Sequence, residues 1–174
     1  MLNVEGIEEY KSVKISSLSD AKELIPKLKS QGKKVGLCHG GFDLLHPGHI
    51  KHFESAKKLC DVLFVSITSG EFVALRKGGG RPIYPDKLRA YSIASIKFVD
   101  YVVISNFNTG IEVIKTLKPD YYIKGSDYVD STDSEINAER EAIDSIGGKI
   151  KYTNDPKLST TDIIGYIKNE IWVY

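Results

Sequence analysis

The chain has 174 residues, of which 41% are hydrophobic and 27% charged, and its formal net charge at pH 7 is +1. This composition is typical of a soluble globular protein, and the length suffices for one domain that folds without a disulfide or a metal. The small net charge gives no reason to expect nucleic acid or an anionic membrane as the partner. No apolar run approaches the roughly 20 residues of a membrane span, and the acidic first residues do not resemble a signal peptide. We therefore expect a single cytoplasmic domain over 1–174, with a lead-in and first helix over 1–33.

Strand-like apolar runs and helical patterns alternate along the chain. A helix is predicted over 16–32, with Ser17 or Ser19 as its cap and Gly32 at its end, although Pro26 could shorten it. Further helices are predicted over 46–59, 85–97, 109–117, 133–148 and 160–172. Strands are predicted over 34–38, 61–68, 100–105, 119–125 and 149–153.

This alternation predicts an α/β fold, namely a Rossmann-like, doubly wound, five-stranded parallel sheet with helices on both faces. Ligands of such folds bind beyond the carboxyl ends of the strands, where the strand order reverses. The stretch HGGFDLLHPGH, residues 39–49, leaves the first of these strands and enters a helix. It therefore lies where the fold places its ligand.

The first half of this stretch is a glycine turn. Gly40 and Gly41 allow a tight turn and a close approach of the backbone to a bulky ligand, although a plain strand-to-helix turn would need the same residues. The chain contains no GxGxxG motif, and neither of its GK dipeptides is followed by Ser or Thr. Any nucleotide must therefore be bound by a device other than the dinucleotide fingerprint or the P-loop.

The second half carries two histidines at a helix start. His46 and His49 are three residues apart, so their side chains lie on one face beside the free N–H groups that favour anions. Zinc is the alternative ligand, for which Asp43 is the one nearby candidate as a third protein ligand. His52 projects further round the helix and is expected at the surface.

These motifs resemble a known family. Residues 40–61 (GGFDLLHPGHIKHFESAKKLCD) are similar to the signature of the HxGH nucleotidylyltransferases of the cytidylyltransferase-like group. Four further segments follow in the order and spacing of that group, namely 74–89, 95–104, 117–128 and 158–164. The resemblance extends from about residue 13 to 167. Within the group, the KGGGRP and IKGSDY segments are most similar to the nucleotidylyltransferase domain of ADP-heptose synthase. Glycerol-3-phosphate cytidylyltransferase is a more distant match.

The resemblance implies a reaction and its partners. A nucleotidyl group is transferred from a nucleoside triphosphate to a phosphorylated sugar or polyol, with release of pyrophosphate, to make a precursor of a surface polysaccharide. ATP with a heptose 1-phosphate is the first choice, and CTP with glycerol 3-phosphate or another acidic phosphate is the alternative. Mg²⁺ is expected to bridge the triphosphate without a dedicated protein metal site. A homodimer is also implied, with Lys97 and Asp100 at its contact. A non-catalytic nucleotide- or metal-binding module is the rival from a different class.

The resemblance also implies roles for particular residues. His46, His49 and Lys77 are the catalytic candidates, and Asp43, Lys77 and Arg81 are the candidates for binding the acceptor. The nucleotide-binding candidates are Gly40, Gly41, Phe42, Arg89, Gly125, Asp127, Ser159, Thr160 and Thr161.

Two of these assignments have structural alternatives, and two segments depart from the family pattern. Ser159 to Thr161 could form a simple helix cap, and Asp127 could be a turn residue. The segment NDPKLSTT lacks the family's arginine, for which Lys157 could substitute. The segment HGGFD lacks the asparagine and cysteine usual in the heptose enzymes, which leaves the substrate open.

Overall fold

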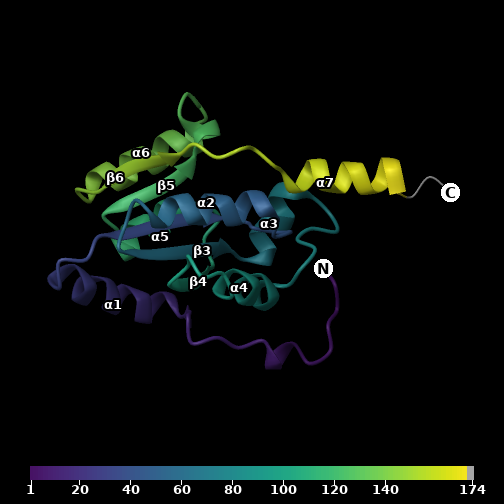
Figure 1. Cartoon of the computed structure of the whole chain (residues 1–174), viewed down its shortest axis with the longest axis horizontal. Helices are drawn as coiled ribbons and strands as arrows, with labels where there is room; N and C mark the ends of the chain where they lie inside the picture. Colours follow the sequence, from purple (N-terminus) through teal and green to yellow (C-terminus); the bar gives the residue numbers. More distant parts are fainter. Residues whose placement is uncertain (172–174) are drawn as a thin grey trace.

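A computed structural model describes residues 1–171 and confirms the α/β fold (Figure 1). The sheet has six parallel strands where five were predicted. The strands are β1 (Ile15–Ser16), β2 (Val35–Gly40), β3 (Val62–Thr68), β4 (Tyr101–Ser105), β5 (Tyr121–Gly125) and β6 (Lys149–Thr153). The additional strand is β1, which pairs Ile15 with Val102 and Ser16 with Val103 at the β4 edge. Two residues within a polar lead-in are too few to produce a recognisable alternation of apolar and polar positions.

The helices connect these strands, and one of them was not predicted. They are α1 (Leu18–Ser30), α2 (Pro47–Lys57), α3 (Gly70–Lys77), α4 (Asp86–Ala94), α5 (Gly110–Leu117), α6 (Ser134–Ser145) and α7 (Thr160–Tyr166). Short 3-10 turns lie at Ile7–Glu9 (η1) and Ser126–Tyr128 (η2), and a π-helical turn at Ile167–Ile171 follows α7. The unpredicted helix is α3, which lies between the predicted strand over 61–68 and the predicted helix over 85–97. The predicted end of the last helix at Trp172 lies outside the described residues.

The first helix shows how local sequence sets its ends. Ser17 is the N-cap of α1, because its hydroxyl accepts a hydrogen bond of 3.0 Å from the Asp20 N–H. The helix continues through Pro26 to Ser30, so the proline does not shorten it. Gly32 follows with a φ of 77°, a left-handed conformation that favours glycine.

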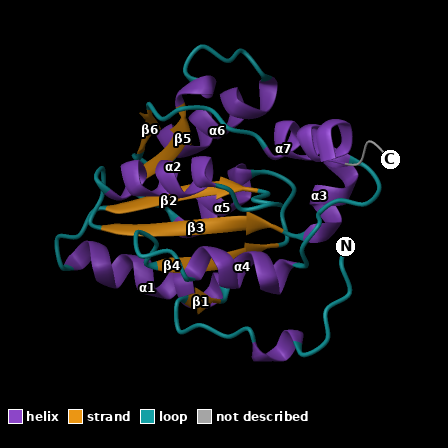
Figure 2. Ribbon diagram, turned by 45° about the vertical axis from the view of Figure 1, so that its right-hand side comes forward, coloured by secondary structure: helices purple, strands orange, loops and turns teal. Residues whose placement is uncertain are grey.

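Helices cover both faces of the sheet, as Figure 2 shows. Successive side chains of a strand point to opposite faces, so Val65 of β3 packs on one side and Phe64 on the other. The first core contains residues of α2 and α4, including Phe53 and Ile93. The second contains residues of α1, α5 and α6. This two-sided burial explains why residues 61–68 form an almost unbroken apolar run.

The strand order reverses at β2. This strand pairs with β3 on one side and with β5 on the other, because the chain first builds β3 and β4 and then returns to add β5 and β6. The carboxyl ends of β2 and β5, at Gly40 and Gly125, therefore flank the switch point where such sheets bind their ligands. Within residues 1–171, the structure contains no helix that is both long and apolar enough to cross a membrane.

Candidate active site

A cavity of about 380 Å³ opens at the switch point, and we call it the first cavity. Its walls come from the turn after β2, the start of α2, the end of β5 with η2, and the segment 153–161. Most of the predicted site residues meet here, although they are spread over more than 100 positions of the chain. Those that line it are Gly40, Gly41, Phe42, His46, His49, Lys77, Gly125, Asp127, Ser159, Thr160 and Thr161.

The glycine turn shapes one wall of the first cavity. Phe42 adopts a φ of 41°, which is uncommon for a non-glycine residue, and its ring folds back over the turn. A Cβ at Gly40 would lie 3.2 Å from the Phe42 ring, so a side chain at that position would force the ring to move. The Phe42 ring meets the His49 ring edge-on, with 5.2 Å between their centroids. The turn therefore fixes the position of a histidine as well as the path of the backbone.

The imidazoles of His46 and His49 stack on each other at the first turn of α2. Their centroids are 3.7 Å apart and the ring planes differ by 22°. His46 is the N-cap residue, and its carbonyl accepts a hydrogen bond of 3.0 Å from the His49 N–H. The Nδ1 atoms of both rings are buried, and neither has a hydrogen-bond partner among the described residues. Buried polar atoms usually have partners, so this pair is poised to bind a ligand group.

Both imidazoles are neutral at physiological pH. Burial lowers the pKa of His49 to about 3, with smaller contributions from the neighbouring His46, His52 and Lys77. Burial also lowers the pKa of His46, with a smaller effect of the Lys77 charge. A neutral imidazole offers one N–H donor to an anion without requiring a buried cation.

We expect the free energy of unfolding to fall as the pH is lowered from about 7 to about 5. The pKa values of His49 and His39 are both lowered to about 3 in the folded chain, whereas an unfolded histidine titrates near 6.5. Below about 6.5 the unfolded chain therefore binds more protons than the folded one, and each histidine contributes a slope of up to about 1.4 kcal/mol per pH unit. Urea unfolding across this window measures the slope, and His39→Gln with His49→Gln should reduce it, leaving the part that His46 and His52 contribute. A stability that is constant or rises on acidification would contradict the expectation.

His52 does not lie at the surface as predicted. Its Nε2 is 3.3 Å from Cys38 Sγ in β2, and its Nδ1 is 2.8 Å from Thr153 Oγ1 at the end of β6. The side chain lines the first cavity between these two strands, and burial lowers its pKa. His52 lies further round α2 than His46 and His49, as predicted. It is not exposed, because β6 packs against that side of the helix and covers the His52 side chain.

The segment Ser159 to Thr161 lines the first cavity, and its three hydroxyls have different surroundings. Ser159 is the N-cap of α7 and accepts a hydrogen bond of 3.1 Å from the Asp162 N–H. Thr160 is buried and donates from Oγ1 to the Leu44 carbonyl at 3.3 Å, which ties α7 to the histidine loop. Thr161 is exposed and free to contact a ligand. The cap alternative therefore applies to Ser159, while all three residues remain predicted phosphate ligands.

The three residues predicted to bind the acceptor separate into two groups. Lys77 lies in the last turn of α3 and lines the first cavity, where burial and the Arg81 charge lower its pKa. Asp43 is buried, pairs with Arg81 and accepts a 2.5 Å hydrogen bond from the Ile83 N–H. Neither Asp43 nor Arg81 lines the first cavity. These two residues brace the loop after α3 against the histidine loop, and their contact with the acceptor stays a prediction.

Arg89 also lies behind the first cavity and not in its wall. The side chain is buried, and Nη1 donates to the carbonyls of Gly41 (2.6 Å) and Thr68 (2.9 Å). Its remaining nitrogens bond to the Tyr84 carbonyl and to Asp86. Arg89 thus supports the glycine turn from beneath, and a direct contact with nucleotide stays a prediction.

Gly125 and Asp127 line the first cavity at the end of β5 and in η2, as predicted. A Cβ at Gly125 would lie 2.6 Å from Asp127 Oδ1, so the glycine is what lets the carboxylate fold back over the strand end. Lys157 lines the same cavity, in the segment that lacks the family's arginine. Asp100 bonds to Lys57 and to the Leu63 N–H within the chain, and the dimer contact stays a prediction.

Sequence reasoning missed several polar residues of the site. His39 bridges neighbouring strands, with Nδ1 3.1 Å from Ser66 Oγ and Nε2 3.3 Å from Thr68 Oγ1. Lys124 lines the first cavity although it had been read only as part of the IKGSDY segment. A signal existed for both, because each occupies a strand position just before a carboxyl end at the switch point.

The described residues offer no cluster of metal-ligating side chains that would support zinc as the ligand. Across residues 1–171, no three His, Cys, Asp or Glu side chains gather in a group that could hold a metal ion. The carboxylate of Asp43, the proposed third ligand, is taken by Arg81 and the Ile83 N–H.

Comparison with known proteins identifies the class. Residues 37–165 match the family model described as Cytidylyltransferase-like, and the chain belongs to this family. The chain is accordingly a nucleotidyltransferase, and the predicted resemblance is confirmed.

Curated relatives and solved structures agree with this assignment. The bifunctional protein HldE of Nitratiruptor sp. is 40% identical over 156 residues, which cover 84% of this chain and 34% of that protein. The bifunctional protein HldE of Sulfurimonas denitrificans is 35% identical and covers 99% of this chain and 36% of that protein. The chain therefore spans about a third of the length of these relatives.

Two solved structures share the fold. A lipopolysaccharide core biosynthesis protein from Thermoplasma volcanium matches with a TM-score of 0.57 and 26% identity, over 74% of this chain and all of that one. A pantoate-beta-alanine ligase from Francisella tularensis matches with a TM-score of 0.59 at 18% identity, over 94% of this chain and 79% of that one.

Proposed function

We propose that the chain transfers adenylate from ATP to a heptose 1-phosphate or a closely similar sugar phosphate. A phosphate oxygen of the acceptor attacks the α-phosphorus of ATP. The bond between the α-phosphorus and the α,β-bridging oxygen breaks at the same time. Pyrophosphate leaves with the electrons of that bond. The attacking oxygen is already ionised at neutral pH, so no general base is needed. The task of the protein is to place two anions in line and to stabilise charge on the α-phosphate.

The observation that carries the proposal is the stacked, neutral pair His46 and His49 in a cavity shared with Ser159 to Thr161. Imidazole N–H donors at the first turn of α2 would stabilise charge that grows on the α-phosphate. The Thr161 hydroxyl and the Lys77 and Lys157 ammonium groups of the same cavity would hold the β- and γ-phosphates. Gly40 and Gly41 would let the triphosphate lie against the backbone.

The choice of acceptor is supported by the relatives. Two of them are bifunctional HldE proteins, and one similar solved structure is that of a lipopolysaccharide core biosynthesis protein. Together with the resemblance to the ADP-heptose synthase domain, these names favour a sugar nucleotide that feeds a surface glycan.

Magnesium would be held mainly by the triphosphate, whose oxygens this ion prefers. Asp155 is the residue that fits as a protein ligand, because its carboxylate lines the first cavity and its buried Oδ2 has no hydrogen-bond partner among the described residues. Its other oxygen, Oδ1, accepts a hydrogen bond of 2.7 Å from Ser55 Oγ, which fixes the carboxylate. The ion would neutralise phosphate charge during the transfer.

A matrix of nucleotides and acceptors tests the proposal. ATP, CTP, GTP and UTP are each paired with heptose 1-phosphate, glucose 1-phosphate and glycerol 3-phosphate in the presence of Mg²⁺, and pyrophosphate release is measured. We expect the highest kcat/KM for ATP with heptose 1-phosphate. A preference for CTP with glycerol 3-phosphate would favour the alternative substrates, and no release from any pair would contradict transfer to phosphorylated sugars and polyols altogether.

Thermal unfolding with each nucleotide provides an independent readout. A nucleotide at about 100 times its dissociation constant should stabilise the fold by about 2.7 kcal/mol. Stabilisation by zinc alone, without a response to any nucleotide, would favour a metal-binding module.

A further inference from the structure

A second cavity of about 330 Å³ lies against the first one. Both cavities are lined by the end of β2 and by side chains from α3, β5 and η2; the shared residues are His39, Gly40, Gly41, Lys77, Lys124 and Tyr128. The second cavity extends from this common wall toward the start of α6. The nucleotide machinery described above uses the first cavity and leaves the second without a role.

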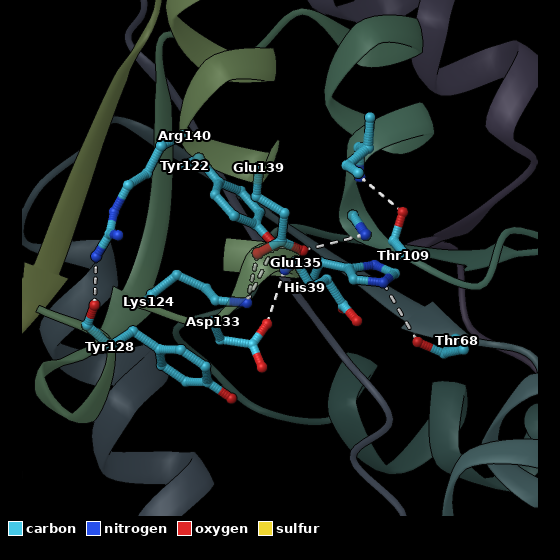
Figure 3. A network of polar contacts seen from close by, with 12 residues as sticks. His39, Thr68, Thr109, Tyr122, Lys124, Tyr128, Asp133, Glu135, Glu139 and Arg140 are labelled. Carbon is cyan, nitrogen blue, oxygen red and sulfur yellow. Dashed lines mark hydrogen bonds and ion pairs between the residues drawn. The ribbon is translucent and has the colours of Figure 1, made fainter. Parts of the chain in front are cut away.

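Lys124 stands at the junction and is held there by a buried carboxylate (Figure 3). Its Nζ is 2.8 Å from Oε2 of Glu139, a residue that is 1% exposed. Oε1 of Glu139 accepts hydrogen bonds from the Tyr122 hydroxyl (2.8 Å) and the Gly110 N–H (3.1 Å). Lys124 Nζ also lies 4.5 Å from the centre of the Tyr128 ring. The Lys124 and Glu139 side chains are 12% and 1% exposed, so their ion pair is largely removed from water. The ammonium is therefore fixed in place before any ligand arrives.

The far wall of the second cavity carries two carboxylates and one guanidinium. Asp133 and Glu135, at the start of α6, line it together with Arg76 of α3. Oδ1 of Asp133 accepts the Glu135 N–H at 2.7 Å, and Oε2 of Glu135 pairs with Arg76 at 2.6 Å. Each of these two carboxylates keeps a second oxygen that can accept hydrogen bonds from a ligand. Val73 and Ile136 add apolar surface to the lining of the second cavity.

Resting on the proposed function, we propose that the second cavity binds the polyhydroxylated sugar of the acceptor, with Lys124 on the acceptor phosphate at the junction. At the junction the two cations Lys77 and Lys124 face one carboxylate, Glu139. At the far wall, by contrast, the two carboxylates Asp133 and Glu135 face one cation, Arg76. A phosphate is therefore attracted to the junction, and sugar hydroxyls can donate hydrogen bonds to the free carboxylate oxygens of the far wall. The charge gradient along the cavity thus orients the acceptor with its phosphate toward the first cavity, where the α-phosphate of the nucleotide would lie. A cavity of this size is at the lower end of those that enclose small ligands, which suits one sugar ring.

The first test removes the ammonium together with its buried partner, in Lys124→Met/Glu139→Gln, so that no uncompensated buried carboxylate remains. We expect the KM for heptose 1-phosphate to rise about 10- to 100-fold, the loss typical of one charged hydrogen bond. The KM for ATP should change less than about 3-fold, and circular dichroism should confirm the fold. Lys151→Met is the matched control, because Lys151 also comes from a strand and lies over a tyrosine ring, but lines neither cavity. Equal increases in both KM values, or no increase in the acceptor KM, would overturn the proposal.

The second test addresses the far wall. Asp133→Asn keeps the helix cap, because asparagine caps as well as aspartate. Its neutral amide oxygen accepts hydrogen bonds from sugar hydroxyls less strongly than a carboxylate does. Combined with Glu135→Gln, Asp133→Asn should raise the KM for heptose 1-phosphate more than the KM for glycerol 3-phosphate, which reaches less far from the junction. The same increase for both acceptors would contradict sugar binding at this end.

Direct binding separates this proposal from the proposed function. Titration calorimetry with heptose 1-phosphate, in the absence of nucleotide, should show binding to the wild type and to Lys151→Met and at least about 10-fold weaker binding to Lys124→Met/Glu139→Gln. If no substrate pair releases pyrophosphate but this difference is observed, the transfer is refuted and the site stands. If transfer occurs and the variants bind heptose 1-phosphate equally, the site is refuted and the transfer stands.

Discussion

Replacing His49 by alanine should lower kcat about 100- to 1000-fold while the affinity for nucleotide changes only a few-fold. The His49 ring lies in the first turn of α2, stacked on His46 at 3.7 Å, and its pKa of about 3 keeps it neutral. Its N–H would meet charge that grows on the α-phosphate as the acceptor oxygen approaches. An interaction that strengthens only in the transition state affects kcat and leaves ground-state binding almost unchanged. Steady-state pyrophosphate release and calorimetric nucleotide binding measure the two quantities separately.

A phenylalanine at position 49 distinguishes the donor from the packing. His49→Phe keeps a ring that can stack on His46 and contact Phe42, whose centroid lies 5.2 Å from that of His49, but it offers no N–H. We expect it to be as slow as His49→Ala while remaining folded. A His49→Phe protein with nearly normal kcat would show that the ring acts by shaping the cavity and not by donating a hydrogen bond.

Features set by local pattern could be predicted from the sequence. Residues 61–68 form β3 almost as expected, because both faces of a central strand are buried and the run is apolar throughout. The positions of His46 and His49 on one turn followed from their spacing. By contrast, α3 spans only Gly70–Lys77, and about two helical turns give too little periodicity to recognise.

Features set by packing across the sheet could not be predicted. His52 was expected to be exposed, but its environment depends on Thr153, which lies 101 residues further along the chain. The interaction of Lys124 with Glu139 depends on how α6 packs against β5, which no local pattern encodes. These long-range contacts place the acceptor cavity proposed above, whereas the histidine motif alone indicates only where the nucleotide could bind.

Charge near a motif is also an ambiguous signal. The resemblance to the family implied that Asp43 and Arg89 contact substrate. The structure places both behind the first cavity, where their hydrogen bonds go to the protein itself. Charged residues that support a glycine turn and charged residues that bind a ligand at that turn occupy the same region of sequence, so only packing separates them.

Replacing Arg89 by methionine should lower the free energy of unfolding by about 3–5 kcal/mol, because several carbonyl acceptors would lose their hydrogen-bond partner, at about 1–3 kcal/mol for each one that is buried. Arg89 is 2% exposed, and its guanidinium donates to the carbonyls of Gly41, Thr68 and Tyr84 as well as to Asp86. Methionine has a similar length but no donor, so these carbonyls and the carboxylate would lose their partner. Urea unfolding followed by circular dichroism measures the change.

Arg76→Met is the control for the loss of an arginine charge, because Arg76 and Glu135 form an ion pair in which both side chains are 38% exposed. Such an exposed pair contributes at most about 1 kcal/mol, so the two variants should differ clearly in stability. Arg89→Met should also loosen the glycine turn, since Gly41 would lose the 2.6 Å hydrogen bond that fixes its carbonyl, and kcat should fall with it. An Arg89→Met protein that is as stable as Arg76→Met, yet has a strongly raised KM for nucleotide, would instead show that Arg89 binds the phosphates directly.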